Sequence, residues 1–144
     1  MKTYYIIAAL CTLLAAGASA DEYIGNVSAN KYNSNSTSNP NGAGSPYHAN
    51  SINNSNGKYG SPYSSTSANN PYATDAPKLY DRQGNYRGKL SSNPYDEDST
   101  SNPYGRYGSP YSSESINNPY GAGSPYGNES PTNPYGDGLE MYGE

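Results

Sequence analysis

Pro-Tyr pairs interrupt the chain from Ser45 onward, and their spacing is regular. Successive pairs lie 16, 9, 23, 9, 7, 9, 6 and 9 residues apart, so that a step of nine and a step of seven make a 16-residue unit. Residues 57–73 and 105–121 are identical at 13 of 17 positions. The tyrosines of these pairs are Tyr47, Tyr63, Tyr72, Tyr95, Tyr104, Tyr111, Tyr120, Tyr126 and Tyr135.

Each unit predicts a local turn. In Asn-Pro-Tyr-Gly, which occurs at 102–105, 118–121 and 133–136, the Asn side chain can cap a type I β-turn, proline presets φ and glycine closes the turn. Ser-Pro-Tyr is a weaker version of the same signal. A β-helix is the alternative, but it needs an inward-facing aliphatic side chain in every coil. Because only Ile52 and Ile116 recur at comparable places, the pattern favours a string of turns.

A shortage of aliphatic side chains limits the core that this chain can form. Twelve prolines remove backbone donors, and the many glycines raise the entropy cost of folding. We therefore expect a mostly disordered or irregular, β-turn-rich repeat chain rather than a cooperative globular domain. Outside the first 20 residues, the aliphatic side chains are Ile24, Val27, Ile52, Leu79, Leu90, Ile116, Leu139 and Met141.

Residues 1–20 have the pattern of a secretory signal peptide, with the expected helix in the apolar run 6–16. A basic start at Lys2 precedes that run, and Ala18-Ser19-Ala20 is a small-residue cleavage site. The pattern predicts cleavage after Ala20 and export to the periplasm or the cell exterior. The run is too short to span a bilayer, so no membrane attachment is expected after cleavage. Cys11 suggests a lipoprotein anchor as an alternative, which the large Leu10 before it disfavours.

The exported chain divides into five segments. We expect a disordered polar lead-in at 21–44, Pro-Tyr repeat regions at 45–77 and 91–136, and an acidic tail at 137–144 that frays or serves as a small docking tag. Between the repeat regions, residues 78–90 lack proline and gather charge. Leu79, Tyr80, Tyr86 and Leu90 flank a turn at 83–85, so this segment predicts a short β-hairpin. An isolated hairpin is marginal in water and needs support from neighbouring groups.

Part of the chain resembles a set of uncharacterised exported bacterial proteins. Those proteins carry Tyr-Asp-x-x-Gly-x-Tyr-x-Gly-x-Leu, followed by Asn-Pro-Tyr-Gly-Arg-Tyr-Gly-Ser-x-Tyr-Ser and Ser-Ile-Asn-Asn-Pro-Tyr-Gly. The matching residues here are 80–90, 102–112 and 115–121. The resemblance implies export and a hairpin-plus-repeat plan, and it implies no activity.

Charge and residue types exclude several classes of function. The net charge of −4 does not suit a nucleic-acid partner. Cofactor and metal sites are not expected, because the exported chain has no Cys and His48 has no acidic neighbour in sequence. An EF-hand loop starting at Asp96 fails, since Ser101 stands where glycine is required. A nucleophilic triad would need a rigid scaffold that the sequence does not predict, so we expect no enzyme.

Tyrosine is the only aromatic residue, and it both packs and donates hydrogen bonds. Spaced tyrosines suit weak multivalent association, with the chain itself or cell-envelope polysaccharide as partner. The leading hypothesis is a non-enzymatic exported structural or interaction protein. The alternative is a carbohydrate- or peptidoglycan-binding module centred on 78–90, and a small metal carrier is third. The candidate interaction residues are Tyr80, Arg82, Tyr86, Arg87, Tyr104, Tyr107, Tyr111 and Tyr120.

Overall fold

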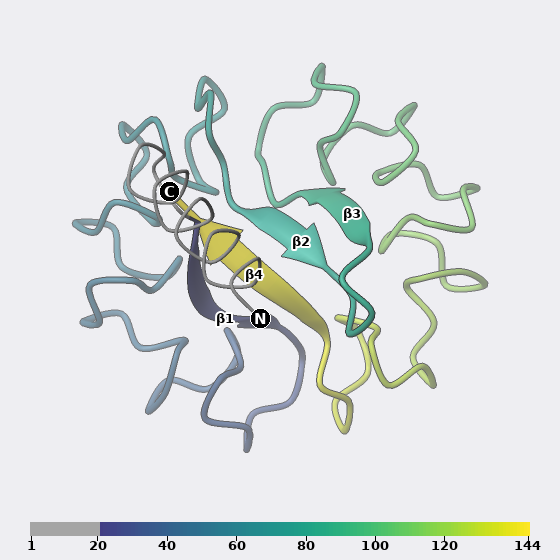
Figure 1. Ribbon diagram of the computed structural model, residues 1–144, viewed down its shortest axis with the longest axis horizontal. Helices are drawn as coiled ribbons and strands as arrows, with labels where there is room; N and C mark the ends of the chain where they lie inside the picture. Colours follow the sequence, from purple (N-terminus) through teal and green to yellow (C-terminus); the bar gives the residue numbers. More distant parts are fainter. Residues whose placement is uncertain (1–20) are drawn as a thin grey trace, which may run out of the picture.

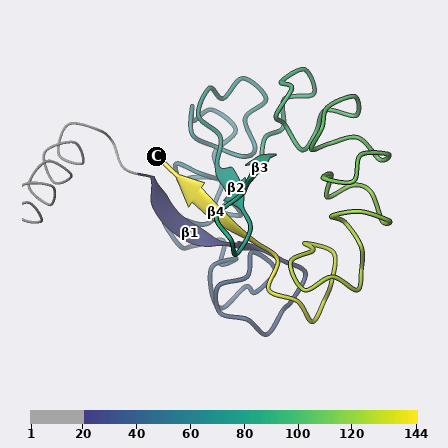
Figure 2. The same ribbon diagram turned by 45° about the vertical axis from the view of Figure 1, so that its right-hand side comes forward.

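Consecutive β-turns form two long strings that surround a small sheet (Figure 1). The computed structural model describes residues 21–144, so the expected signal helix lies outside the described residues. Within 21–144 every named element is a β-strand, and no helix long and apolar enough to cross a bilayer is found there. The first string lies between β1 and β2, and the second lies between β3 and β4. The two strings face each other across the sheet (Figure 2).

The turns follow one another every three residues along most of each string. Gly105 N–H donates to the carbonyl of Asn102 (3.1 Å), and Asn102 N–H donates to the carbonyl of Ser99 (3.2 Å). The last residue of one turn is therefore the first residue of the next. The prediction of a string of turns is confirmed.

Where asparagine or serine begins a turn, its side chain caps that turn. Asn102 Oδ1 accepts the N–H of Tyr104 at 3.0 Å, and Asn102 Nδ2 donates to the carbonyl of Asp96 at 3.1 Å. One asparagine thus joins its own turn to the turn that begins six residues earlier. Serine makes only the capping contact within its own turn. For example, Ser109 Oγ accepts the N–H of Tyr111 at 3.1 Å. Local capping of this kind explains why Asn and Ser recur at the corners of the string.

The sheet has four strands: β1 (Glu22–Val27), β2 (Lys78–Tyr80), β3 (Tyr86–Lys89) and β4 (Leu139–Gly143). Their spatial order is β1-β4-β2-β3, and every pair is antiparallel. The predicted hairpin is confirmed as β2 and β3. Its support comes from β4, which pairs with β2 along its whole length.

An approximate two-fold axis relates the first half of the described chain, from β1 to β2, to the second half, from β3 to β4. The central pair is Leu79 with Met141, and the pairs on either side of it mirror one another. β1 corresponds to β3, with a bulge and a positive-φ glycine in each strand pair, at Gly25 (129°) and Gly88 (96°). Every strand pairs with a strand from the other half, because β1 pairs with β4 and β2 pairs with β3 and β4.

The eight aliphatic side chains of residues 21–144 gather in one cluster on the sheet. They are joined by Tyr59, which is fully buried and donates its hydroxyl to the carbonyl of Glu144 at 2.9 Å. The cluster contains Ile24, Tyr59, Leu79, Leu139 and Met141, with Val27, Ile52, Leu90 and Ile116 packed against it.

Buried serines continue this core into the turn strings. Ser36 Oγ donates to the carbonyl of Ser28 at 3.0 Å and accepts the N–H of Ser38, so all its hydrogen-bonding atoms face the backbone. Ser99 makes the same contacts in the second half. A small hydroxyl can be buried when it is satisfied in this way. The buried serines are Ser28, Ser36, Ser51, Ser67, Ser91, Ser99, Ser115 and Ser130.

Three expectations differ from this structure. The predicted disordered lead-in contains β1, and the predicted fraying tail contains β4, a central strand. The repeat regions, expected to be mostly disordered, follow defined turns. The physical reason is the same in each case. Side-chain caps satisfy the hydrogen bonds of the backbone locally, so the chain needs to bury little apolar surface. The apolar side chains that are buried lie in one cluster on the sheet.

Candidate functional site

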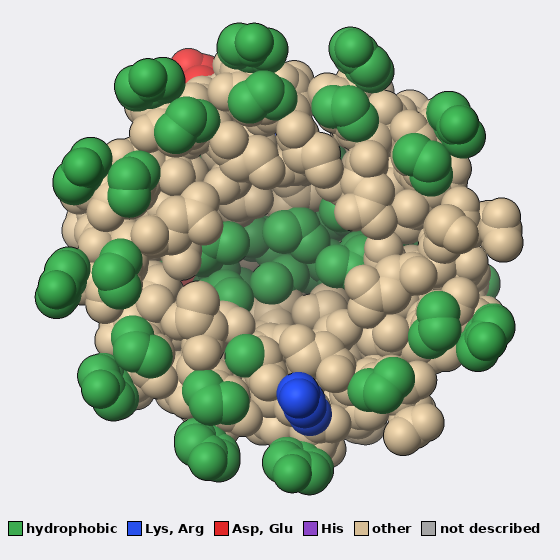
Figure 3. Space-filling view, turned by 180° about the vertical axis from the view of Figure 1, so that it is seen from behind, with side chains coloured by type: hydrophobic (Ala, Val, Ile, Leu, Met, Phe, Trp, Pro, Cys, Tyr) green, Lys and Arg blue, Asp and Glu red, His purple; other side chains and the backbone are tan. Residues whose placement is uncertain are grey.

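Ten tyrosines point outward around the edge of the molecule, and we call them the tyrosine rim. Their side chains are 85% to 97% exposed. In space-filling view, hydrophobic side chains form separate knobs around the whole edge, and a hollow in the middle of this face has hydrophobic side chains at its bottom (Figure 3). The rim consists of Tyr32, Tyr47, Tyr63, Tyr72, Tyr95, Tyr104, Tyr111, Tyr120, Tyr126 and Tyr135.

The turn geometry directs these rings outward. Tyr120 lies at the third position of its turn, where its N–H is accepted by Asn118 Oδ1 at 3.0 Å, and Pro119 fixes the residue before it. The backbone below each ring is therefore constrained while the ring itself is exposed. The rim therefore presents ten exposed rings on defined turns.

A second group of tyrosines crosses the sheet, and we call it the tyrosine ladder. Ring centroids of Tyr23 and Tyr142 lie 5.6 Å apart, those of Tyr142 and Tyr80 5.6 Å, and those of Tyr80 and Tyr86 5.8 Å. Tyr107 extends the ladder beyond β3, with its centroid 5.7 Å from that of Tyr86. The planes are steeply inclined to one another, which is the preferred edge-to-face packing of aromatic rings.

Three of the ladder tyrosines, Tyr23, Tyr86 and Tyr142, have a raised pKa. Burial, followed by the charge of Asp98, raises the pKa of Tyr86, whose hydroxyl donates to Asp98 Oδ2 at 3.1 Å. Burial and Glu140 likewise raise the pKa of Tyr23 and of Tyr142. These phenols therefore act as neutral hydrogen-bond donors.

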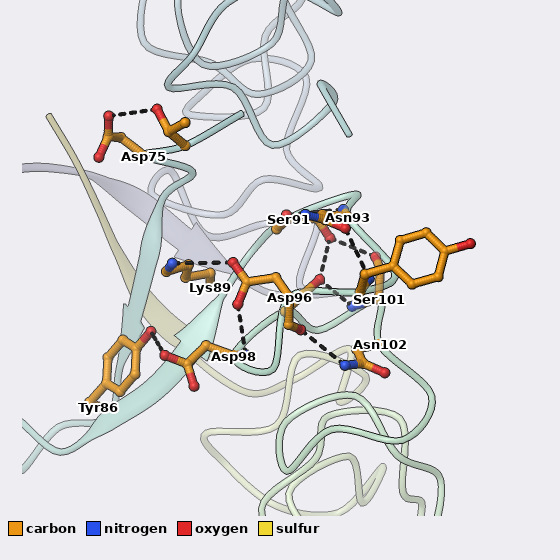
Figure 4. A network of polar contacts seen from close by, with 12 residues as sticks. Asp75, Tyr86, Lys89, Ser91, Asn93, Asp96, Asp98, Ser101 and Asn102 are labelled. Atoms are coloured by element: carbon orange, nitrogen blue, oxygen red, sulfur yellow. Dashed lines mark hydrogen bonds and ion pairs between the residues drawn. The ribbon is translucent and has the colours of Figure 1, made fainter. Parts of the chain in front are cut away.

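Carboxylates pair with all four basic side chains of the hairpin. Lys89 Nζ lies 3.2 Å from Asp96 Oδ2, next to the Tyr86–Asp98 contact (Figure 4). Lys78 lies 3.5 Å from Asp21, and Arg82, which is exposed, pairs with Asp137. The hairpin therefore does not present a free positive patch.

Arg87 contacts two carboxylates. Its Nε lies 3.4 Å from Asp81 Oδ2, and its Nη1 lies 3.9 Å from Glu114 Oε1. Asp81 is buried and accepts the N–H groups of Gln83 and Asn85. Burial raises the pKa of Asp81, but the hydrogen bonds of Asn85 and the charge of Arg87 outweigh it and hold the pKa below the ordinary value.

The expected interaction residues fall into separate groups. Tyr80 and Tyr86 lie in the ladder. Three of the other expected tyrosines lie in the rim. Tyr107 was expected at an interaction surface, but it is only 6% exposed because it faces inward between two turns, beside the guanidinium of Arg106. The rim tyrosines in the expected set are Tyr104, Tyr111 and Tyr120.

The sequence analysis did not single out two ladder residues, Tyr23 and Tyr142, because they lie near opposite ends of residues 21–144. A repeated pattern could have revealed the first. Residues 23–27 and 86–90 both read Tyr-x-Gly-x-aliphatic.

The polar residues considered as ligands are used within the fold. His48 Nδ1 accepts the N–H of Asn50 at 3.3 Å and so caps its own turn, and Asp96 Oδ1 accepts the N–H of Asp98 at 2.9 Å. Across residues 21–144, no group of three or more His, Cys, Asp or Glu side chains is placed to hold a metal ion.

Comparisons of the chain with protein-family models, with curated proteins and with solved structures gave no match.

Proposed function

We propose that this protein is a non-enzymatic, exported structural or interaction element of the bacterial envelope or the cell exterior. It acts through the tyrosine rim, which makes many weak contacts at once. The observation that carries this proposal is the 85% to 97% exposure of ten rings on constrained turns. Each ring offers apolar area and one hydroxyl donor, and a rigid arrangement reduces the entropy lost when several contacts form together.

The test is self-association of the exported chain, measured by sedimentation velocity over a range of concentrations. We expect the mean mass of wild type to rise with concentration. Replacing Tyr104, Tyr111 and Tyr120 with serine should weaken this rise, since three adjacent contacts are lost.

A matched control replaces the ladder residues Tyr80 and Tyr86 with phenylalanine, which keeps the rings. This variant should associate like wild type. A wild-type chain that stays monomeric at every concentration, and that is not retained by envelope polysaccharide, would contradict the proposal.

The tyrosine ladder supports a second candidate, binding of a cell-envelope saccharide. A row of phenol rings offers apolar stacking faces to a sugar ring. Retention on purified peptidoglycan should fall when Tyr80 and Tyr142 are replaced with alanine. It should not change in the triple serine variant of the rim. The opposite pattern would assign any retention to the rim.

A further inference from the structure

The internal two-fold symmetry holds for the strands but not for two buried tyrosines. In the second half, residues 105–108 read Gly-Arg-Tyr-Gly, whereas the corresponding residues 42–44 read Gly-Ala-Gly. In the other turns the exchange is reversed, with Gly-Lys-Tyr-Gly at 57–60 and Gly-Ala-Gly at 121–123. Tyr107 therefore corresponds to Ala43, and Tyr59 corresponds to Ala122.

The bulge glycines confirm the first correspondence in space. A Cβ placed on Gly88 would lie 2.8 Å from the Cβ of Tyr107, and a Cβ placed on Gly25 would lie 3.0 Å from the Cβ of Ala43. Ala43 thus begins where Tyr107 begins, but it carries no ring.

A cavity lies beside Ala43, where its counterpart carries a ring. Its volume is about 650 Å³, and Tyr23, Ile24 and Gly25 form one side of it. Tyr23 corresponds to Tyr86, the residue against which the Tyr107 ring packs at 5.7 Å. We call this cavity the Ala43 site.

The second exchange has the same result. Tyr59 packs against Gly143 at the end of β4 and donates to the carbonyl of Glu144. The residue that corresponds to Gly143 is Asp81, at the end of β2. Asp81 and Ala122 both line a cavity of about 330 Å³, which we call the Ala122 site.

Polar groups of the Ala122 site suit a phenol. Arg87, Asp81 and Glu114 line this cavity. A phenol hydroxyl can donate to a carboxylate and accept from a guanidinium, whereas an aliphatic side chain can do neither.

We propose that the Ala43 and Ala122 sites bind phenol side chains, and that the partner is a rim tyrosine of a second copy of this chain. The chain itself shows which group fits, since its other half places a tyrosine at each position. The rim supplies the same side chain, exposed and held on a fixed turn. Each copy would both donate and accept rings through different surfaces, a contact that builds open assemblies.

This inference rests on the proposed function, because it names the receptor for the rim. The first experiment is an NMR titration of the exported chain with N-acetyl-L-tyrosinamide. We expect saturable shifts of the amide signals of Gly25 and Ala43 at one site, and of Gly121 and Ala122 at the other. Absence of shifts at both sites would overturn the proposal.

The second experiment fills the sites from within. Ala43→Tyr should abolish the shifts at the Ala43 site alone, and Ala122→Tyr those at the Ala122 site. The double variant should lose most of its self-association in sedimentation. Asn56→Tyr is the control, since Asn56 is exposed and lines neither cavity.

If Ala43→Tyr does not fold, a further variant replaces Ala43 with the dipeptide Arg-Tyr. This insertion reproduces the sequence of residues 105–108. Unchanged association of the filled variants would overturn this inference while leaving the rim proposal intact. A wild type that binds the probe at both sites but stays monomeric would overturn the second copy as partner.

Discussion

Single residues in this protein act mainly through the backbone. Asn102 shows the pattern, because its side chain accepts one N–H and donates to one carbonyl six residues earlier. A hydrogen bond of this type stabilises by about 1 kcal/mol net. Repeated along both strings, such contacts replace the aliphatic burial that most domains use.

The two contacts of Asn102 can be separated by substitution. Asn102→Ala should lower the free energy of unfolding by about 2 kcal/mol, since both bonds are lost. Asn102→Ser should lower it by about 1 kcal/mol, because a hydroxyl still caps Tyr104 but does not reach Asp96. Urea denaturation measures both values. Equal losses in the two variants would show that the capping bond contributes nothing.

The buried carboxylate of Asp81 gives stability a dependence on pH. Its pKa is lowered in the folded chain from the ordinary value of 3.8, so the unfolded chain binds the proton more readily. The stabilisation is present above the unfolded pKa and is lost as pH falls through the lower folded pKa. Asp81→Asn should therefore be less stable than wild type at pH 7, by about 2 kcal/mol.

The difference between these two proteins should shrink as pH falls below about 4. Denaturation series at pH 7, 5 and 3 measure it. A constant difference across the series would mean that the charge of Asp81 is not the stabilising feature.

The edge strands depend on glycine at their bulges. Gly88 has φ of 96°, and a Cβ there would lie 2.7 Å from Cγ of Tyr107 and 2.8 Å from the carbonyl oxygen of Asp98. Both the backbone conformation and the space require glycine at this position. Gly84, in the hairpin turn, has φ of 84° but nothing within 4 Å of such a Cβ.

These two glycines separate strain from collision. Gly84→Ala should cost about 1 kcal/mol of unfolding free energy, from the left-handed conformation alone. Gly88→Ala should cost about 3 kcal/mol or more, because the added methyl also displaces the Tyr107 ring. Thermal denaturation compares them, and equal costs would contradict the collision.

At the scale of the whole molecule, the first and last strands of the described chain pair with each other. β1 and β4 pair from Glu22 with Gly143 to Val27 with Leu139, so the first and last described strands are neighbours. Since all strand pairs join the two halves, neither half has a paired sheet of its own. We infer that the turn strings and the sheet unfold together.

Removing β4 tests this dependence. A chain of residues 21–138 loses a central strand and the Met141 side chain, which is 1% exposed. We expect loss of amide dispersion throughout, including the turns at 50–70 that are far from the cut in sequence. Met141→Leu in residues 21–144 is the control and should fold. Persisting turn signals in the truncated chain would show that the strings are stable alone.

The sequence by itself determined the local structure, because its causes are local. Asparagine or serine, proline and tyrosine in succession specify a capped turn through atoms only a few residues apart, and Leu79 to Leu90 specify a hairpin. The outward direction of the rim tyrosines follows from the same turns.

Only the tertiary structure decided where the eight aliphatic side chains meet and that Tyr23, Tyr80, Tyr86 and Tyr142 share one row. These contacts join residues as far apart as Tyr23 and Tyr142, and no short sequence pattern predicts a contact over such a separation. The physical reason is the pairing of β4 with both β1 and β2, which brings the two turn strings around one sheet. It concentrates scarce apolar surface at one sheet, and there a core forms that the composition alone argued against.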